Sequence, residues 1–303
     1  MISVTGVQKK FGAITAVDNL DFECTSGEMI ALIGPNGSGK STVLRIVAGL
    51  MKADKGEVRI DGELMAISAV RLRKRISYLP QRVAFPEQAT AEELLTFFAR
   101  VRKIPQTRVS ELISTFGFHD FEKKQVGELS GGMLQRLAIA VVFLPQADLY
   151  ILDEATNNLD ADGLARFREE TLSVLKRNAA VIMSTHILKE VESLAHKIAI
   201  MARGRVVLTR RIEQFVEDMG QSRKMWITLQ DLTEKYGKIA LDMGAEKVSL
   251  NCETMTVECR EDLRIPILHA LFLAGATVKE FGLHEPSLEK IYYQCLNMET
   301  TEQ

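Results

Sequence analysis

One segment constrains this chain more than any other: a glycine-rich loop between an apolar run and an amphipathic run. It fits the pattern G-x-x-x-x-G-K-[ST] and consists of Gly34, Pro35, Asn36, Gly37, Ser38, Gly39, Lys40 and Ser41. The apolar run before it, residues 29–33, predicts a buried strand, and the apolar spacing after it predicts a helix that ends near Gly49. A phosphate-binding loop needs this strand–loop–helix context. The sequence therefore predicts an α/β fold that binds a phosphorylated ligand.

The residues of this loop have separate tasks in phosphate binding. Glycines let successive backbone N–H groups turn toward a phosphate, and the helix N-terminus adds a partial positive charge. Lys40 is expected to reach the β- and γ-phosphates of a nucleotide, and the Ser41 hydroxyl to ligate Mg²⁺. Thr42 is expected to line the same site. The alternative, a glycine-rich turn that binds nothing, leaves the complete motif in its context unexplained.

Length, charge and cysteine content exclude several classes of protein. The 303 residues suit one large and one small domain, and the net charge of −2 indicates no strong attraction to nucleic acid. The chain starts in strand-like sequence rather than a signal peptide, and no apolar run approaches the roughly 20 residues that span a bilayer. The cysteines lack metal-ligand spacing; they are Cys24, Cys252, Cys259 and Cys295. We expect a cytoplasmic protein with reduced thiols and no zinc or copper site.

Acidic residues and a histidine follow two apolar runs. Residues 149–152 lead into the adjacent carboxylates Asp153 and Glu154. Because acids at the end of a buried strand are costly unless they have a role, Asp153 is expected to hold the Mg²⁺ shell and Glu154 to polarise an attacking water. Residues 179–184 lead to His186, at a strand end where ligands bind in parallel sheets. A lone histidine is usually structural, but this position favours a functional role.

Two further side chains are candidates for nucleotide contacts. Gln81 ends a predicted strand over residues 76–81, so its amide oxygen is placed to reach Mg²⁺ or a water near the γ-phosphate. Taken alone, it is an ordinary loop glutamine. Phe11 offers an aromatic face on which adenine can stack, and a core phenylalanine is the alternative.

A second glycine-rich helix start occurs farther along the chain. Ser130, Gly131 and Gly132 precede an apolar helical run over residues 137–144. Glycines and a serine at a helix N-terminus form an anion-binding nest, here without a lysine. The alternative is a serine-capped helix with a flexible entry. One chain therefore carries two predicted phosphate-binding helix starts.

Strands are also predicted outside the motifs. Residues 2–4 and 20–24 have strand patterns with a turn between them, and the alternation over residues 55–60 followed by Asp61 and Gly62 predicts a hairpin.

Helical segments interrupt the predicted nucleotide-binding elements. Thr90 and Glu93 form a capping box, with Thr at the N-cap and Glu at N3. Apolar residues follow at helical spacing, and a second helical run covers residues 109–116. We expect these helices to form a sub-domain over about residues 85–145.

This ordered set of motifs resembles the nucleotide-binding subunit of an ABC transporter, over about residues 2–215. Gly34–Ser41 matches the phosphate loop of the family, Gln81 matches the Q-loop, and Leu129–Gly132 matches the signature. Tyr150–Asp153 matches the Walker B strand, with Glu154 behind it. The D-loop and the switch histidine are matched by Asn158–Asp160 and His186, and the adenine-stacking aromatic by Phe11.

The resemblance implies a P-loop NTPase fold of the ABC cassette type, which binds and hydrolyses ATP with Mg²⁺. It implies that Lys40, Glu154 and His186 are catalytic, and that Ser41, Gln81 and Asp153 ligate the metal. The other residues matched to these motifs would contact the nucleotide, including Asp160 and the signature residues Ser130, Gly131 and Gly132. It also implies a head-to-tail homodimer with two ATP molecules at the interface, each between one chain's phosphate loop and the other chain's signature. That arrangement accounts for the two nests.

Three positions depart from the commonest family pattern. Ala155 replaces a usual proline, Asn157 and Asn158 replace smaller residues of the D-loop, and Met133 replaces a common signature glutamine. None of these changes removes a catalytic group. We therefore expect hydrolysis to be retained.

The remaining residues, 216–303, have their own alternation of strands and helices. Strand patterns at 225–229, 247–250, 255–259 and 276–281 alternate with helical patterns at 232–243 and 262–274, and a short helix is predicted at 286–292. We expect a small α+β accessory domain. Pro286–Glu289 resembles ATPases that serve ABC-2-type permeases. Within that group, residues 97–100 and 284–289 are similar to the ATPases of transporters that help mature nitrous-oxide reductase, a copper enzyme.

Three functions compete for such a chain. The first is an ATPase that drives a separate transmembrane permease from the inner face of the cell membrane. The second is a soluble ATPase of the same class that acts on a macromolecular assembly such as the ribosome or DNA, and the third is an assembly protein without useful turnover. The single cassette disfavours the second, and Glu154 and His186 disfavour the third. We expect the permease to bind near Gln81, where Val83, Ala84 and Phe85 are predicted to be exposed; the alternative is that Phe85 packs in the sub-domain core.

Overall fold

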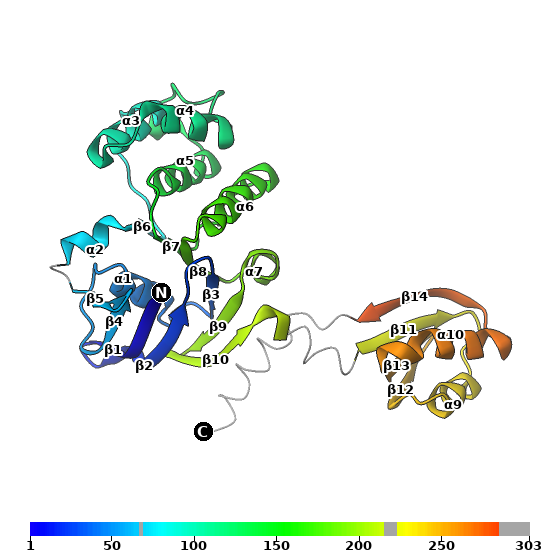
Figure 1. The fold of residues 1–303 in the computed structure, drawn as a ribbon. Coiled ribbons are helices and arrows are strands. Elements are labelled where there is room, and N and C mark those ends of the chain that lie inside the picture. The colour runs from blue at the N-terminus through cyan, green and yellow to red at the C-terminus, as the bar shows by residue number, and fades with distance from the viewer. Residues whose placement is uncertain (67–68, 215–222, 285–303) are drawn as a thin grey trace. The chain divides into compact units, whose positions relative to one another are not determined.

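The computed structural model describes residues 1–66, 69–214 and 223–284 (Figure 1). Contacts within the chain divide it into two compact units, the first running to Arg211 and the second beginning at Ile212. Each unit has its own hydrophobic core. The two units are described separately.

A six-stranded sheet, mostly parallel, forms the centre of the first unit, with the strand order β10-β9-β3-β8-β7-β6. Its strands are β3 (Met29–Ile33), β6 (Ile76–Leu79), β7 (Leu149–Asp153), β8 (Ala180–Thr185), β9 (Lys197–Ala202) and β10 (Arg205–Arg211). Every residue of β3, β7 and β8 is buried, as continuous apolar runs in a parallel sheet predict. The carboxyl ends of these strands carry the predicted site residues.

An antiparallel sheet with the order β2-β1-β4-β5 forms a second layer. Its strands are β1 (Ile2–Phe11), β2 (Ile14–Cys24), β4 (Lys55–Ile60) and β5 (Glu63–Leu64). The predicted β4–β5 hairpin is confirmed. The prediction that the first strand ends at Val4 and the second starts at Leu20 is wrong, because both strands continue to a tight turn at Gly12. Register shifts in the β1–β2 ladder interrupt the two-residue alternation on which such predictions depend.

Helix α1 (Lys40–Val47) packs between the two sheets. Its apolar residues Val43, Leu44 and Val47 are buried in a core that also includes strand residues of both sheets, such as Leu20 and Ile182. The phosphate loop therefore connects the central strand β3 to a helix that is fixed on both sides.

The helical insert follows β6, and its helices gather on one side of the unit (Figure 1). It contains α3 (Ala91–Arg102), α4 (Gln106–Thr115), the short η1 (Val126–Glu128) and α5 (Gly131–Phe143), while α2 (Val70–Lys74) precedes β6. The predicted capping box is confirmed, since Thr90 Oγ1 accepts from Glu93 N and Glu93 reaches back to Thr90 N. Helices α6 (Ala161–Lys176) and α7 (Leu188–Leu194) follow β7 and β8.

The second unit has the order β11 (Arg223–Leu229), α9 (Glu234–Asp242), β12 (Lys247–Asn251), β13 (Thr254–Cys259), η2 (Glu261–Leu263), α10 (Arg264–Leu273) and β14 (Val278–His284). Its sheet order, β12-β13-β11-β14, with every neighbour antiparallel, is that of a ferredoxin-like βαββαβ unit. Alternate residues of β11, such as Met225 and Ile227, are buried in its core. The helix predicted at 286–292 lies outside the described residues.

Candidate nucleotide site

The phosphate loop has a backbone that only glycine fits at two positions. A Cβ at Gly34 would lie 2.3 Å from the Met201 carbonyl oxygen. At Gly39 a Cβ would lie 2.3 Å from the Ala16 carbonyl oxygen, and this residue has a φ of 102°. The loop therefore runs closely between β2 and the end of β9, and its backbone N–H groups start helix α1.

Lys40 lies folded over this loop. Its Nζ donates to the carbonyl oxygens of Gly34, at 2.7 Å, and Pro35, at 3.0 Å. Burial lowers the pKa of Lys40, and the negative charges of Glu154 and Asp153 oppose that shift. Ser38 Oγ is also buried, and no described residue hydrogen-bonds to it. The loop thus presents a cation and a hydroxyl group suited to phosphate oxygens.

Asp153, at the end of β7, joins the loop to the sheet. Its Oδ1 accepts hydrogen bonds from Ser41 Oγ, at 3.1 Å, and from Ser184 Oγ, at 2.6 Å. Its Oδ2 is buried and has no hydrogen-bond partner among the described residues. A buried carboxylate oxygen without a partner is costly, and an oxygen ligand beside a serine hydroxyl suits Mg²⁺. These residues therefore fit the metal that the family resemblance implies.

Glu154 lies where three loops meet. Its backbone is left-handed, with a φ of 54°, and its Oε2 accepts from Gln81 Nε2 at 2.9 Å and from Asn157 Nδ2 at 2.8 Å. His186 Nδ1 lies 4.0 Å from Glu154 Oε1. A non-glycine residue in this backbone conformation is strained, and such strain is common at functional sites. The structure therefore brings Gln81, Glu154 and His186 together, beside Asp153.

The second glycine-rich helix start has the predicted local structure. Ser130 caps α5, with its Oγ accepting from Met133 N at 3.3 Å. A Cβ at Gly131 would meet no atom within 4 Å, whereas one at Gly132 would lie 2.9 Å from the Asn158 carbonyl oxygen. Among the described residues, no hydrogen bond joins these three residues to the phosphate loop. The open side of Gly131 leaves room for a ligand or another chain.

Asp160 and Phe11 lie in different surroundings from the cluster of Gln81, Glu154 and His186. Asp160 caps α6, accepts from Gly163 N at 2.9 Å and pairs with Arg136, whose guanidinium lowers the pKa of this carboxylate. Phe11 lies at the tip of the β1–β2 hairpin and is 48% exposed, with Lys9 Nζ 5.7 Å from its ring centroid. An exposed ring agrees with the stacking prediction more than with the alternative of a core phenylalanine.

Three polar residues support the site, and their roles were missed at the sequence level. Ser184 binds both acids, Asn157 holds Glu154 Oε2, and Gln135 Nε2 donates to the Ala155 carbonyl oxygen at 2.6 Å. The available signal was a serine within the apolar run of β8. Such a residue, when buried, needs a partner.

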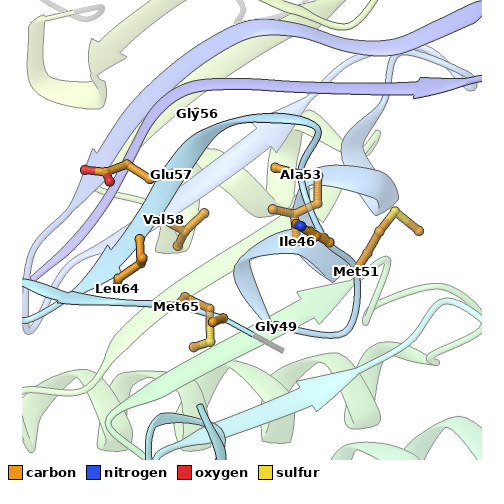
Figure 2. A pocket seen from close by; sticks show the side chains of 11 residues that line it. Ile46, Gly49, Met51, Ala53, Gly56, Glu57, Val58, Leu64 and Met65 are labelled. Atoms are coloured by element: carbon orange, nitrogen blue, oxygen red, sulfur yellow. The ribbon is translucent and has the colours of Figure 1, made fainter. Parts of the chain in front are cut away.

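A separate apolar cavity of about 540 Å³ lies between the end of α1 and the β4–β5 hairpin (Figure 2). It is lined by Ile46, Gly49, Met51, Lys52, Ala53, Gly56, Glu57, Val58, Leu64, Met65 and Ala66. None of the predicted site residues lines it. The cavity is therefore distinct from the nucleotide site.

The fold and this site define a P-loop ATPase of the cassette type. The family model described as ABC transporter matches residues 17–157. The Nod factor export ATP-binding protein I of Sinorhizobium fredii is 34% identical over 308 residues, which cover 98% of this chain and 86% of that protein. The chain belongs to the ABC transporter family, among its ATP-binding subunits.

Solved structures agree with this assignment. The ATP-binding subunit of an ABC transporter has a TM-score of 0.67 and 27% identity, and the match covers 73% of this chain and 93% of that one. A dimeric ATP-binding cassette in a post-hydrolysis state, bound to ADP and Pi, has the same fold, with a TM-score of 0.65, 24% identity and coverage of 70% and 99%. Within the described part of the chain, no helix is long and apolar enough to cross a membrane.

Proposed function

We propose that this chain drives a separate membrane permease of the exporter class, through ATP-dependent closure of a head-to-tail homodimer. The observation that carries the proposal is the hydrogen-bonded cluster that joins Ser41, Asp153, Glu154 and Gln81. It connects the phosphate loop to the group placed to activate water and to the loop that enters the helical insert. The Nod factor relative is named for export, and this supports the direction of transport.

Mg²⁺ would be held by Ser41, Asp153 and Gln81. Asp153 offers its unpartnered Oδ2, and Ser41 offers a hydroxyl oxygen. Gln81 uses its amide nitrogen for Glu154, so its amide oxygen remains for the metal or a metal-bound water. When bound, the ion would supply positive charge that stabilises the negative charge developing on the phosphate during hydrolysis.

Three residues of the chain have separate proposed roles in hydrolysis. Lys40 would leave the Gly34 and Pro35 carbonyl oxygens to bind phosphate oxygens, because an ammonium gains more from an anion than from a neutral acceptor. The Glu154 carboxylate would orient the attacking water and accept its proton, with Gln81 and Asn157 fixing its position. His186, next to Glu154, would contact the γ-phosphate end of the nucleotide.

A second copy of the chain would complete each site. The start of α5 offers Ser130 and an open Gly131, but no hydrogen bond joins this nest to the phosphate loop within the described part of one chain. The nest has no lysine of its own. We propose that it faces the phosphates of the nucleotide bound by the phosphate loop of the other copy, and so completes that copy's site. An ATP-binding cassette of the same fold is a dimer with ADP and Pi bound. For this chain we propose that two ATP molecules lie between the two copies.

The permease contact is proposed for the aromatic surface of the helical insert. Phe97 and Val101 on α3 are 58% and 62% exposed, whereas Val83 and Phe85 are half-buried. The Phe85 ring packs at 6.1 Å against Phe98, which in turn lies 5.4 Å from Phe97. The prediction that Val83, Ala84 and Phe85 are exposed is confirmed for Ala84 and wrong for the half-buried Val83 and Phe85. Phe85 packs beneath the exposed ring of Phe97 through Phe98. A permease helix that buries Phe97 and Val101 would hold the chain at the cytoplasmic face of the membrane.

A narrower hypothesis assigns the exporter to the maturation of nitrous-oxide reductase. It rests on sequence similarity at residues 97–100 and 284–289, and residues 285–289 lie outside the described part of the chain. Within the described ranges, no group of three or more His, Cys, Asp and Glu side chains is placed to hold a metal ion. The permease would therefore select the cargo. Loss of copper from nitrous-oxide reductase in a strain without this chain would support the hypothesis, and full copper loading would contradict it.

The general proposal is tested with the purified full-length chain. ATP hydrolysis is measured with Mg²⁺ and with excess chelator, for the unmodified chain, Lys40→Ala and Asp153→Asn. We expect turnover that needs Mg²⁺ and that falls by at least about a hundredfold in both variants. Turnover that survives the chelator or the Asp153→Asn change would contradict the proposed metal site.

A further inference from the structure

Ser184 is a fully buried polar residue in β8 that touches both acids of the site. Its Oγ donates to Asp153 Oδ1 at 2.6 Å and accepts from the Glu154 backbone N–H at 3.1 Å. The strand register explains this position, because Asp153 and Ser184 are paired residues on adjacent parallel strands. One hydroxyl group therefore connects the side chain of one acid to the backbone of the next.

This hydroxyl gives the two carboxylate oxygens of Asp153 different hydrogen bonding. A carboxylate rotates broadly about its last bond, so its oxygens are normally interchangeable. Here Oδ1 receives two hydroxyl donors, Ser41 and Ser184, while Oδ2 is buried and receives none from the described residues. The donors hold the carboxylate in one orientation, and Oδ2 is left as the acceptor for a metal or its water.

The same hydroxyl supports the strained backbone of Glu154. The N–H of Glu154 is shared between the carbonyl oxygen and the Oγ of Ser184, both at 3.1 Å. A second acceptor strengthens the hold on a residue whose φ is 54°. Loss of the hydroxyl leaves the carbonyl acceptor in place, so the strand pairing survives.

We propose that Ser184 is a positioning residue that orients Asp153 toward Mg²⁺ and Glu154 toward the attacking water. The inference rests on the proposed metal site at Asp153. Partners that orient metal ligands typically contribute about 10- to 100-fold to metal affinity or activity. Removing the Ser184 hydroxyl should therefore weaken metal binding and slow turnover, while ATP binding without metal is unchanged.

The test measures metal affinity directly, by electron paramagnetic resonance of Mn²⁺ added to the full-length chain with a non-hydrolysable ATP analogue. Ser184→Ala should raise the dissociation constant of Mn²⁺ by about tenfold or more, and Ser184→Thr, which keeps the hydroxyl, should restore much of the affinity. Binding of a fluorescent ATP analogue in chelator should be the same for all variants.

Ser77→Ala is the matched control. Ser77 is a buried strand serine of the same sheet, 4% exposed, and its Oγ donates to the Val142 carbonyl oxygen at 2.6 Å, away from both acids. Ser77→Ala should lose about as much thermal stability as Ser184→Ala, without any change in Mn²⁺ affinity. If Ser184→Ala folds poorly, Ser184→Cys, which keeps the side chain's bulk but donates weakly, is judged by the same measure.

The outcomes separate this inference from the proposed function. Unchanged Mn²⁺ affinity in Ser184→Ala, or an equal loss in Ser77→Ala, would overturn the positioning role. Asp153→Asn must abolish Mn²⁺ binding for the proposed metal site to stand. A strong effect of Asp153→Asn with none of Ser184→Ala therefore rejects only the role of Ser184.

Discussion

The side-chain amide of Gln81 lies 2.9 Å from Oε2 of Glu154. Glu154 is the residue proposed to orient the attacking water, and Gln81 begins the segment that leads through Phe85 to the helical insert. One hydrogen bond thus connects the chemistry to the surface proposed for the permease. If nucleotide binding or hydrolysis moves Glu154 or Gln81, the movement would reach the helical insert through this segment.

The first prediction concerns this hydrogen bond. In Gln81→Ala the Glu154 carboxylate keeps its bond to Asn157 but loses the second donor. The variant loses both this hydrogen bond to a charged group and the amide oxygen proposed for the metal, so kcat should fall by about tenfold or more. Steady-state ATPase kinetics check this. Gln88→Ala, an exposed glutamine of the same segment, is the control and should behave like the unmodified chain.

The second prediction concerns the shared sites. Gly131→Asp places a negative charge where a Cβ meets no atom within 4 Å, so the chain should fold and bind ATP as a monomer but lose turnover. Lys40→Ala should also lose turnover. A mixture of the two variants should regain activity, because each mixed dimer has one site with an intact loop from one copy and an intact nest from the other. A mixture that stays inactive would show that each nest serves its own chain.

The third prediction concerns the permease surface. Phe97→Asp replaces a ring that is 58% exposed with a charged side chain. The ATPase activity of the purified chain should be retained, and its co-purification with membranes should be lost. Phe97 is a better probe than Phe85, whose packing on Phe98 also supports the fold. The control is Leu172→Asp on α6, another exposed apolar residue of the first unit. Equal membrane binding by Phe97→Asp and the unmodified chain would place the contact elsewhere.

The fourth prediction concerns pH. Burial lowers the pKa of Lys40, and its charged form is the one that binds phosphate. ATP affinity should therefore be independent of this group at low pH and weaken as pH rises through the lowered pKa. The fall should begin at a lower pH than for a free lysine, whose pKa is about 10.4.

Titration of a fluorescent ATP analogue between about pH 7 and about pH 10 measures this effect. Lys40→Arg is the control, because a guanidinium stays charged over this range and should remove the alkaline loss. The same alkaline loss in Lys40→Arg would assign the titration to another group.

Local patterns were sufficient to predict most of the nucleotide-binding unit. The phosphate loop, the strands that end at Asp153 and Thr185 and the capped helix at Thr90 all carry short-range signals, and each is present in the structure. The β1–β2 hairpin was placed wrongly because bulges break its alternation. The strand order of the second unit could not be predicted from local patterns, because it depends on pairings between distant segments such as β11 and β14.

The site residues were predicted from motifs, whereas the residues that hydrogen-bond to them were not. Ser184 and Asn157 reach the acids only after β7 and β8 pair in register, and that register is set by the whole sheet. A sequence pattern names the groups that contact a nucleotide more readily than the groups that hold them in place.

The proposed role of Glu154 in hydrolysis is tested directly by one variant. Glu154→Gln keeps the shape of the side chain and removes the carboxylate that we propose as the base, so ATP binding should persist while hydrolysis falls by about 10²- to 10⁴-fold. The ATPase rate and the mass in solution are measured together, with ATP and Mg²⁺ present. We expect very slow turnover with accumulation of a closed dimer. Near-normal turnover, or a variant that stays monomeric with ATP bound, would contradict it.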